Sequence, residues 1–434
     1  MSTRIAVIGT GYVGLISAIG LADFGNIVIG ADIDESKIRR LQSGEPVIYE
    51  PGLAEYLRKN LDSGRLSFTS DVGAAVRSTA VVFNTVGTPP LADGEVDLSQ
   101  VYSVLDIIRK NLDSYKTIVT KSTVPVGTNR QIQQHLMQSA DGTQFDVVSN
   151  PEFLREGKAV QDFFHPDRIV IGCETERARS VMSEIYRPLY LIERPFVWCG
   201  IETAELIKYA SNAFLATKVT FINQIANLCE AVGADVHTVA KAIGMDGRIG
   251  SKFLHPGPGY GGSCLPKDTA ALVKSAEHRG VELSIVREVI LANQRQASRI
   301  VAKLEKALGP LREKNIAVLG LAYKAETDDV RDSPALRIIR ELLERGASVQ
   351  AHDPKAIENC RKLFPRGVRF GKDAFEAVTD ADGLILATEW NEYRNIDLAK
   401  VKGLMRGTCV VDARNLLDPE RARAAGFHYQ GVGR

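Results

Sequence analysis

The feature that most constrains the fold is a glycine-rich turn near the N-terminus, residues Gly9 to Gly14, with the sequence GTGYVG. The apolar run Arg4 to Ile8 precedes this turn, and a helical stretch from Leu15 to Phe24 follows it. A second apolar run, Ile27 to Ala31, ends directly before Asp32. Strand, glycine turn, helix and strand in this order make a βαβ unit. We therefore expect an α/β fold with a doubly wound parallel sheet.

Later apolar runs have the length and composition of further buried parallel strands. In the N-terminal part they occupy residues 80–84, 117–121 and 145–149, with a helical stretch at 98–112. After about residue 200 the pattern changes to long segments with helical spacing, at 202–232 and 269–308. This change predicts a helical central domain that links the other parts of the chain and forms a dimer.

The opening motif returns in weaker form near the C-terminus. The run Ile316 to Gly320 resembles Ile5 to Gly9, and the runs 348–353, 383–388 and 408–412 resemble the later strands. The repeat predicts a second Rossmann-like domain. It lacks the second and third glycines of the motif, so we expect a substrate that carries a mononucleotide there, or a scaffold without ligand. The predicted domains are 1–198, 199–308 and 309–434.

The composition is that of a globular enzyme with more than one domain. The 434 residues exceed the roughly 250 to 300 that one core supports. A net charge of +1 gives no basic excess for nucleic acid. No apolar run reaches the ~18 residues of a membrane span, and no signal-peptide pattern is present, which predicts a cytoplasmic protein. The six cysteines form no CxxC pair and the histidines no HxxxH pattern, so we expect neither disulfides nor a metal site.

In its βαβ context the glycine turn predicts an NAD site, with a turn that binds no ligand as the alternative. The pyrophosphate is expected at the start of the helix. Asp32 lies about 20 residues further on, where its carboxylate can accept from the ribose hydroxyls and would repel a 2′-phosphate. Lys37 is expected beside the adenosine, or else on the solvated surface. The predicted contacts in the turn are Gly9, Gly11, Tyr12, Val13 and Gly14.

A second glycine-rich segment predicts a nucleophile. Gly261 and Gly262 precede Cys264, and Pro266 suits the first turn of a following helix. A cysteine at a helix N-terminus, close to Lys267, favours the reactive thiolate. Asp268, one turn later, can position a water or a proton. The alternative is that Cys264 is a small buried apolar residue.

A lysine and an asparagine on one predicted helix suggest an oxyanion site. Lys208 and Asn212 stand four residues apart, so both project from the same face. The apolar neighbours predict that this helix is largely buried; they are Leu206, Ile207 and Phe214. A buried ammonium and amide need partners, which a developing oxyanion would provide. An ion pair between Lys208 and Glu205 is the alternative.

With these motifs the whole chain resembles the UDP-glucose/GDP-mannose dehydrogenase family. The motifs are GTGYVG at 9–14, NTVGTP at 84–89, STVPVGT at 122–128, NPEFLREG at 150–157, Lys208 with Asn212, GGSCLPKD at 261–268, and AYK at 322–324. The resemblance implies an N-terminal NAD domain, a helical dimerisation core and a C-terminal domain that binds the sugar nucleotide. It also implies oxidation of a sugar primary alcohol to a carboxylate by two NAD, through a thiohemiacetal and a thioester on the cysteine, in support of polysaccharide synthesis.

The resemblance assigns roles to individual residues. Cys264 would be the nucleophile, and Lys208 with Asn212 would stabilise oxyanions. Asp268 and Thr123 would hold a water, and Glu152 is a candidate general base. Further cofactor contacts would be Thr88, Thr123, Glu156, Lys267 and Arg331. The substrate contacts would be Glu152, Phe153, Leu154, Glu156, Lys208, Asn212, Phe253, Leu254, Gly257, Tyr260, Gly261, Lys324 and Arg414, with Arg248 contributed across the dimer.

Three alternatives stay open at this point. The segments at 165–168 and 256–260 favour UDP-glucose as the substrate, whereas Leu265 also occurs in related enzymes for GDP-mannose and N-acetylhexosamine nucleotides. A dehydrogenase of the β-hydroxyacid type would remove a single hydride and would need no cysteine. A catalytically silent NAD-binding scaffold is the third alternative.

Overall fold

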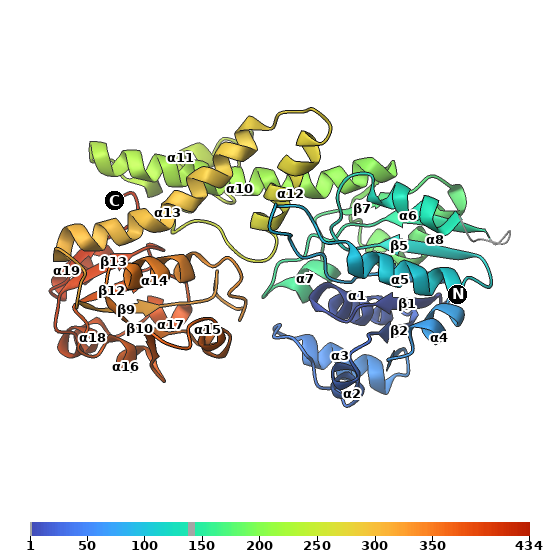
Figure 1. Cartoon of the computed structure of the whole chain (residues 1–434), viewed down its shortest axis with the longest axis horizontal. Helices are drawn as coiled ribbons and strands as arrows, with labels where there is room; N and C mark the ends of the chain where they lie inside the picture. Colours follow the sequence, from blue (N-terminus) through green and yellow to red (C-terminus); the bar gives the residue numbers. More distant parts are fainter. Residues whose placement is uncertain (1, 138–143) are drawn as a thin grey trace. The chain divides into compact units, whose positions relative to one another are not determined.

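The computed structural model describes residues 2–137 and 144–434 and divides into two compact units (Figure 1). The first unit comprises Met1–Ser211 with Glu277–Arg279, and the second comprises Asn212–Ala276 with Gly280–Arg434. The first holds an eight-stranded sheet and the second a six-stranded sheet. The predicted α/β fold with two Rossmann-like sheets and a long helical segment between them is confirmed. The predicted boundaries after residues 198 and 308 remain predictions.

The sheet of the first unit has the strand order β3-β2-β1-β4-β5-β6-β7-β8. Its strands are β1 (Arg4–Ile8), β2 (Ile27–Ala31), β3 (Leu66–Thr69), β4 (Val81–Asn84), β5 (Lys116–Thr120), β6 (Phe145–Ser149), β7 (Ile169–Gly172) and β8 (Phe196–Cys199). Neighbouring strands are parallel except β6 and β7, which pair antiparallel at Ser149 and Gly172. The order reverses between β1 and β4, and ligands of such sheets bind at the carboxyl ends of strands beside this reversal.

Helices cover both faces of this sheet. They are α1 (Tyr12–Asp23), α2 (Glu35–Gln42), α3 (Leu53–Asp62), α4 (Val72–Arg77), α5 (Ser99–Lys110), α6 (Thr128–Met137), α7 (Ala159–Phe164), α8 (Glu176–Ile185) and α9 (Arg187–Leu191). Alternate residues of β1 enter two separate cores, because successive side chains of a strand point to opposite faces. Ile5 and Val7 pack in the core that contains α1, and Ala6 and Ile8 pack in the core that contains α5.

The second unit repeats this arrangement around β9. Its strands are β9 (Asn315–Leu319), β10 (Ser348–His352), β11 (Val368–Phe370), β12 (Gly383–Leu386), β13 (Cys409–Asp412) and β14 (His428–Gln430), in the order β11-β10-β9-β12-β13-β14. Its helices are α14 (Pro334–Glu344), α15 (Ile357–Leu363), α16 (Ala374–Val378), α17 (Asn391–Arg394), α18 (Leu398–Leu404) and α19 (Pro419–Ala424). Ile316 and Val318 face one core, and Ala317 and Leu319 face the other.

The central part of the chain is helical, as predicted, but differs in two respects. Its helices are α10 (Ile201–Val232), α11 (Val236–Gly244), α12 (Leu265–Glu277) and α13 (Ser284–Leu308). The predicted single stretch at 269–308 is two helices, because Gly280 adopts a left-handed φ of 68° that ends the first. The predicted burial of α10 is wrong at Leu206 and Phe214, whose side chains are exposed. Within the described residues no helix is long and apolar enough to cross a membrane.

Candidate active site

The glycine turn in the first unit has the geometry of a dinucleotide cradle. Gly9 has a φ of 94°, and a methyl group on Gly14 would lie 1.8 Å from the Gly9 carbonyl oxygen, so the turn itself requires both glycines. A methyl group on Gly11 would meet nothing within 4 Å. Gly11 caps α1 without any side-chain hydrogen bond. The chain alone gives no reason for a glycine there, whereas the close approach of a pyrophosphate to the helix start does.

Asp32 lies at the carboxyl end of β2 beside this turn. Its Oδ2 accepts from Thr10 N at 2.8 Å and from Lys37 Nζ at 2.9 Å. Burial alone would raise the pKa of Asp32, but Lys37 and the backbone N–H groups more than offset burial and hold the pKa below its usual value. The carboxylate is therefore ionised and suited to ribose hydroxyls. The residues of the turn and the predicted adenosine residues Asp32 and Lys37 lie together and fit NAD.

A buried carboxylate links the glycine turn to a distant loop. Glu50 accepts from the Tyr12 hydroxyl in a short hydrogen bond and from the backbone N–H groups of Gly157 and Ala159, both at 2.7 Å. The pKa of Tyr12 is raised by burial, by Glu50 and by the charge of Glu156, which places Glu156 close to the turn. The sequence analysis missed Glu50, because a single glutamate before a Pro-Gly turn carries no signal of its own.

The loop after β6 carries a buried ion pair. Lys208 Nζ on α10 donates to the backbone oxygen of Glu152 at 2.7 Å and to its Oε1 at 3.0 Å, and both side chains are buried. The alternative ion pair between Lys208 and Glu205 is wrong. Glu205 instead accepts from the backbone N–H groups of Gly127 and Asn129, just before and within the first turn of α6.

Four other predicted residues lie in this loop or beside the sheet reversal. The Phe153 ring lies 5.2 Å from Lys208 Nζ and 3.5 Å from the Arg168 guanidinium. Leu154 donates its N–H to a carboxylate oxygen of Glu152. The Thr88 hydroxyl donates to the backbone oxygen of Thr123 at 3.0 Å. The first unit thus brings the predicted nicotinamide-side threonines together.

In the second unit, Cys264 lies directly before α12, as predicted. Its carbonyl oxygen accepts from Asp268 N at 2.8 Å, and its side chain is exposed while the other five cysteines are buried or partly buried. Burial raises the pKa of Cys360 to about 12 and that of Cys409 to about 11, so those thiols stay protonated at neutral pH. Exposure at a helix N-terminus distinguishes Cys264 as the thiol able to react.

Asp268 is buried one turn after Cys264. Asn212 Nδ2 on α10 donates to its Oδ2 at 2.6 Å, and Lys267 Nζ forms an ion pair with its Oδ1 at 2.7 Å. The amide of Asn212 and the ammonium of Lys267 thus fix the carboxylate. Asn212, Lys267 and Asp268 therefore form one cluster, which begins one turn after the candidate nucleophile. Asn212 and Asp268 are 56 residues apart in the sequence.

The predicted substrate segment 253–261 is held rigidly within the second unit. Gly257 N donates to Asn223 Oδ1 at 2.7 Å, and Tyr260 N donates to Asn293 Oδ1 at 2.8 Å. Leu254 is buried, and Phe253 adopts a left-handed φ of 66°. The segment therefore keeps a fixed backbone conformation.

Residues from the Rossmann-like sheet meet this segment. A methyl group on Gly257 would lie 3.4 Å from Arg414 Nη1, and one on Gly261 would lie 2.4 Å from the backbone oxygen of Asp332. Arg414 donates to the backbone oxygen of Tyr323 at 2.6 Å. Lys324 Nζ lies 5.2 Å from the Tyr323 ring. The structure thus places Arg414 against Gly257, and Lys324 next to the residue whose carbonyl Arg414 contacts.

Two predicted arginines are paired locally. Arg248 is highly exposed and pairs with Asp246 at 2.6 Å, and Arg331 pairs with Asp329 at 2.8 Å. Their predicted contacts with the substrate and the cofactor remain predictions.

In the second glycine turn, two backbone N–H groups already donate to a side chain of the protein. Asp353, at the place that Asp32 takes in the first unit, accepts from Leu321 N at 2.7 Å and Ala322 N at 3.0 Å. The indole Nε1 of Trp390 donates to the same carboxylate oxygen at 3.1 Å. This turn therefore lacks the open cradle of the first.

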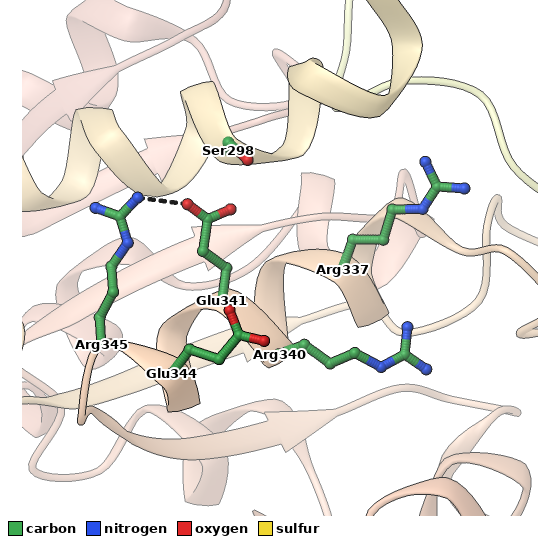
Figure 2. Close-up of a pocket in the computed structure, with 6 residues that line it drawn as sticks. All are labelled: Ser298, Arg337, Arg340, Glu341, Glu344 and Arg345. Atoms are coloured by element: carbon green, nitrogen blue, oxygen red, sulfur yellow. Dashed lines mark hydrogen bonds and ion pairs between the residues drawn. The ribbon is translucent and has the colours of Figure 1, made fainter. Parts of the chain in front are cut away.

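A surface hollow between α13 and α14 was not predicted (Figure 2). It is lined by Ser298, Arg337, Arg340, Glu341, Glu344 and Arg345. Arg345 pairs with Glu341 and with Glu305, and Arg337 pairs with Asp332. Much of the positive charge is thus neutralised locally, and the hollow contains none of the predicted site residues.

Comparison with known proteins gives matches along the whole chain. The NAD binding domain of the UDP-glucose/GDP-mannose dehydrogenase family matches residues 3–190, the central domain 202–295 and the UDP binding domain 317–419. The chain is 49% identical to a UDP-glucose 6-dehydrogenase of Rhizobium meliloti (strain 1021) over 99% of both chains. It is 46% identical to UDP-glucose 6-dehydrogenase TuaD of Bacillus subtilis (strain 168), over 99% of this chain and 93% of the relative.

A solved structure matches equally far. That of a UDP-glucose dehydrogenase from the hyperthermophilic archaeon Pyrobaculum islandicum has a TM-score of 0.94 and 41% identity, over 100% of this chain and 98% of that chain.

Proposed function

The chain belongs to the UDP-glucose/GDP-mannose dehydrogenase family, and we propose that it oxidises the C6 primary alcohol of UDP-glucose to a carboxylate. One observation carries this proposal: an exposed cysteine at the start of a helix, beside a fixed lysine and aspartate, in a chain with an NAD-binding domain. An aldehyde held covalently on a thiol can be oxidised a second time without leaving the enzyme.

The residues of the first unit suit NAD, which accepts a hydride from the substrate carbon when bound. Gly9, Gly11 and Gly14, with the N–H groups of Tyr12 and Val13, would hold the pyrophosphate, and Asp32 would hold the ribose. Thr88, Thr123 and Glu156 would line the nicotinamide side. Lys267 and Arg331 are proposed as further cofactor contacts.

The protein's side chains would then act in sequence on the substrate. The C6 alcohol loses a hydride and a proton, and the Cys264 thiolate adds to the resulting carbonyl carbon. Lys208 and Asn212 would donate to the oxyanion of this thiohemiacetal, whose negative charge is stabilised most strongly in a site that excludes water. A second hydride leaves the same carbon, which gives a thioester with Cys264.

Hydrolysis would complete the reaction. Asp268 and Thr123 would hold a water, and Glu152 would accept its proton as the water adds to the thioester carbon. The carbon–sulfur bond breaks, Cys264 leaves as the thiolate, and the product is a carboxylate. One alcohol and one water thus give one carboxylate, two hydrides and three protons. The product would serve polysaccharide synthesis.

The substrate is proposed to bind to the second unit. The segment Phe253 to Gly261, Lys324 and Arg414 would contact the sugar nucleotide. From the first unit Glu152, Phe153, Leu154 and Glu156 are proposed as further contacts. Lys324 can pair with the charge of the diphosphate.

A homodimer is proposed because one face of α10 is apolar and exposed. Its side chains are between 49% and 67% exposed and recur at intervals of seven and four residues: Phe214, Phe221, Leu228 and Val232. Such spacing places them on a single stripe of the helix. A second copy of the chain would cover this stripe, and Arg248 would act in the partner's site.

The proposed function is tested by counting NADH per UDP-glucose consumed. We expect two, and a value of one would place the enzyme in the single-hydride class. Cys264→Ser should lower turnover on the order of 1000-fold, whereas the matched control Cys199→Ser, at the end of β8, should keep it. Full activity of Cys264→Ser would exclude the covalent route.

The sugar is tested separately with a panel of nucleotides. UDP-glucose is expected to give the highest kcat/KM among UDP-glucose, UDP-N-acetylglucosamine, UDP-N-acetylmannosamine and GDP-mannose. A different best substrate would keep the reaction type and change the substrate.

A further inference from the structure

A buried lysine lies close to the Glu152–Lys208 ion pair and has no place in the mechanism above. Lys121 directly follows β5 at the carboxyl end of the strand, and its side chain is buried. Its Nζ lies 3.2 Å from Asn150 Oδ1 and 3.4 Å from the Tyr186 hydroxyl oxygen. Both hydrogen-bond partners of this ammonium are neutral oxygens.

These contacts fix the turn that carries Glu152. The Tyr186 hydroxyl donates to Asn150 Oδ1 at 2.7 Å, and Asn150 Nδ2 donates to the backbone oxygen of Val170 at 2.8 Å. Asn150 is two residues before Glu152, with Pro151 between them. The side chain of Asn150 is thus held from three sides, and Lys121 is one of them.

The charged groups that act on Lys121 are Glu152 and Lys208, which both have roles in the proposed reaction. Burial lowers the pKa of Lys121, the attraction of Glu152 opposes this effect, and the repulsion of Lys208 adds to it; together they give a pKa of about 8. Tyr186, the other titratable group in contact with Lys121, has a pKa raised by burial and is neutral here. The buried cluster is therefore two lysines and one carboxylate.

We propose that Lys121 is a positioning residue for the reaction proposed above: it fixes the Asn150–Glu152 turn and supplies a second positive charge beside Glu152 and Lys208. The inference rests on the proposed function. With Lys121 protonated the cluster carries a net charge of +1, and with Lys121 neutral it carries none. A net positive charge stabilises the oxyanions that Lys208 would contact, because Coulomb interactions between buried groups are weakly screened.

Turnover should therefore fall as Lys121 loses its proton. In the wild type we expect kcat to decrease above about pH 8, the pKa of Lys121. Lys121→Met should lower kcat at pH 7 roughly tenfold, leave KM for UDP-glucose nearly unchanged, and remove the decrease near pH 8. A residue with a structural role alone would lower kcat equally at every pH.

The chain offers a matched control at the opposite end of the same strand. Lys116 is also fully buried, and its Nζ donates to the backbone oxygen of Thr79 at 2.9 Å. Lys116→Met should keep the wild-type pH profile. Tyr186→Phe removes only the hydroxyl that bridges Lys121 and Asn150, so it provides a milder second variant if Lys121→Met does not fold. It should move the decrease in kcat and keep KM.

A measurement without turnover separates this inference from the proposed function. The Cε resonance of Lys121, followed by carbon-13 NMR in labelled protein, reports its titration. Glu152→Gln should lower the pKa of Lys121 because it removes an attractive charge, and Lys208→Met should raise it because it removes a repulsive charge. If both variants leave the titration unchanged, or if Lys121→Met and Lys116→Met have the same pH profile, the inference is overturned. If the wild type does not oxidise UDP-glucose, the proposed function fails, and the titration alone decides whether the three charges are coupled.

Discussion

Replacing Lys121 by methionine should stabilise the protein at neutral pH while it impairs turnover. The pKa of Lys121 is about 8 in the folded protein and 10.5 when unperturbed. At about 1.4 kcal/mol for each pH unit, this difference corresponds to a cost of about 3 kcal/mol for keeping the ammonium buried below pH 8. Methionine has a similar length and no charge, so it avoids this cost. It loses the buried hydrogen bonds to Asn150 and Tyr186, together worth about 1 to 2 kcal/mol, which leaves a net gain of about 1 to 2 kcal/mol at pH 7.

The pH dependence gives the sharper test. The folded state binds fewer protons than the unfolded state between pH 8 and 10.5, so the contribution of Lys121 to stability rises with pH across this interval. The advantage of Lys121→Met should therefore be largest below pH 8 and should disappear by about pH 10.5. Groups that titrate in both proteins cancel in the difference.

The assay must report on the first unit alone, since a chain with two units need not unfold in one step. The two tryptophans make this possible, because Trp198 belongs to the first unit and Trp390 to the second. Urea unfolding is followed by the fluorescence of Trp198 in a Trp390→Phe background, at pH 7, 8, 9 and 10. Lys116→Met is the control for the loss of a buried lysine. A stability difference between Lys121→Met and its parent that is the same at all four pH values would refute the reasoning.

Three further predictions concern the glycine turn at Gly9 to Gly14, the buried carboxylate of Glu50, and the apolar stripe of α10. Gly11→Ala should change the free energy of unfolding by less than about 1 kcal/mol but weaken NAD binding in calorimetric titration. Gly14→Ala should also lower the unfolding midpoint, because its methyl group would overlap the Gly9 carbonyl. Equal stability of the two variants would contradict the geometry of the turn. Glu50→Gln places an amide NH₂ group against backbone N–H groups, so the free energy of unfolding should fall by about 2 kcal/mol in the same fluorescence assay. An unchanged midpoint would show that the hydrogen bonds of Glu50 do not stabilise the first unit. Phe221→Glu should convert a dimer to a monomer in light scattering, and a variant that stays dimeric would place the interface elsewhere.

Most of the strands that are buried on both faces were predicted from the sequence. The bounds of β1, β2 and β6 agree with the predicted runs, because uninterrupted apolar segments between turns have few alternative structures. The edge strands β3, β8, β11 and β14 were missed, since they are short and contain exposed or half-buried residues. The interior strand β7, of four residues, was missed as well. Burial of α10 was predicted wrongly because an apolar stripe does not reveal whether its own chain covers it.

At the candidate site, features set by neighbouring residues were predicted correctly, whereas contacts between residues far apart in the sequence were not. The helix start after Cys264 follows from its glycines and Pro266, which act within a few residues. The partner of Lys208 is Glu152, 56 residues earlier, whereas spacing on the helix suggested Glu205. Lys121 ends the run 117–121 that was predicted as a buried strand, but its partners Asn150 and Tyr186 lie 29 and 65 residues further along the chain and could not be predicted from spacing.

The occupied turn of the second sheet has a consequence for attempts to redesign nucleotide selectivity. Asp353 already accepts from four backbone amides and the Trp390 indole, so its carboxylate has little capacity left for a ribose. Grafting glycines at 322 and 325 would restore the motif in the sequence alone. A second dinucleotide site would also require the removal of Trp390, which is buried in the core under that turn. The two glycine turns thus differ through the contacts of Asp353 and Trp390, which glycine substitutions alone cannot remove.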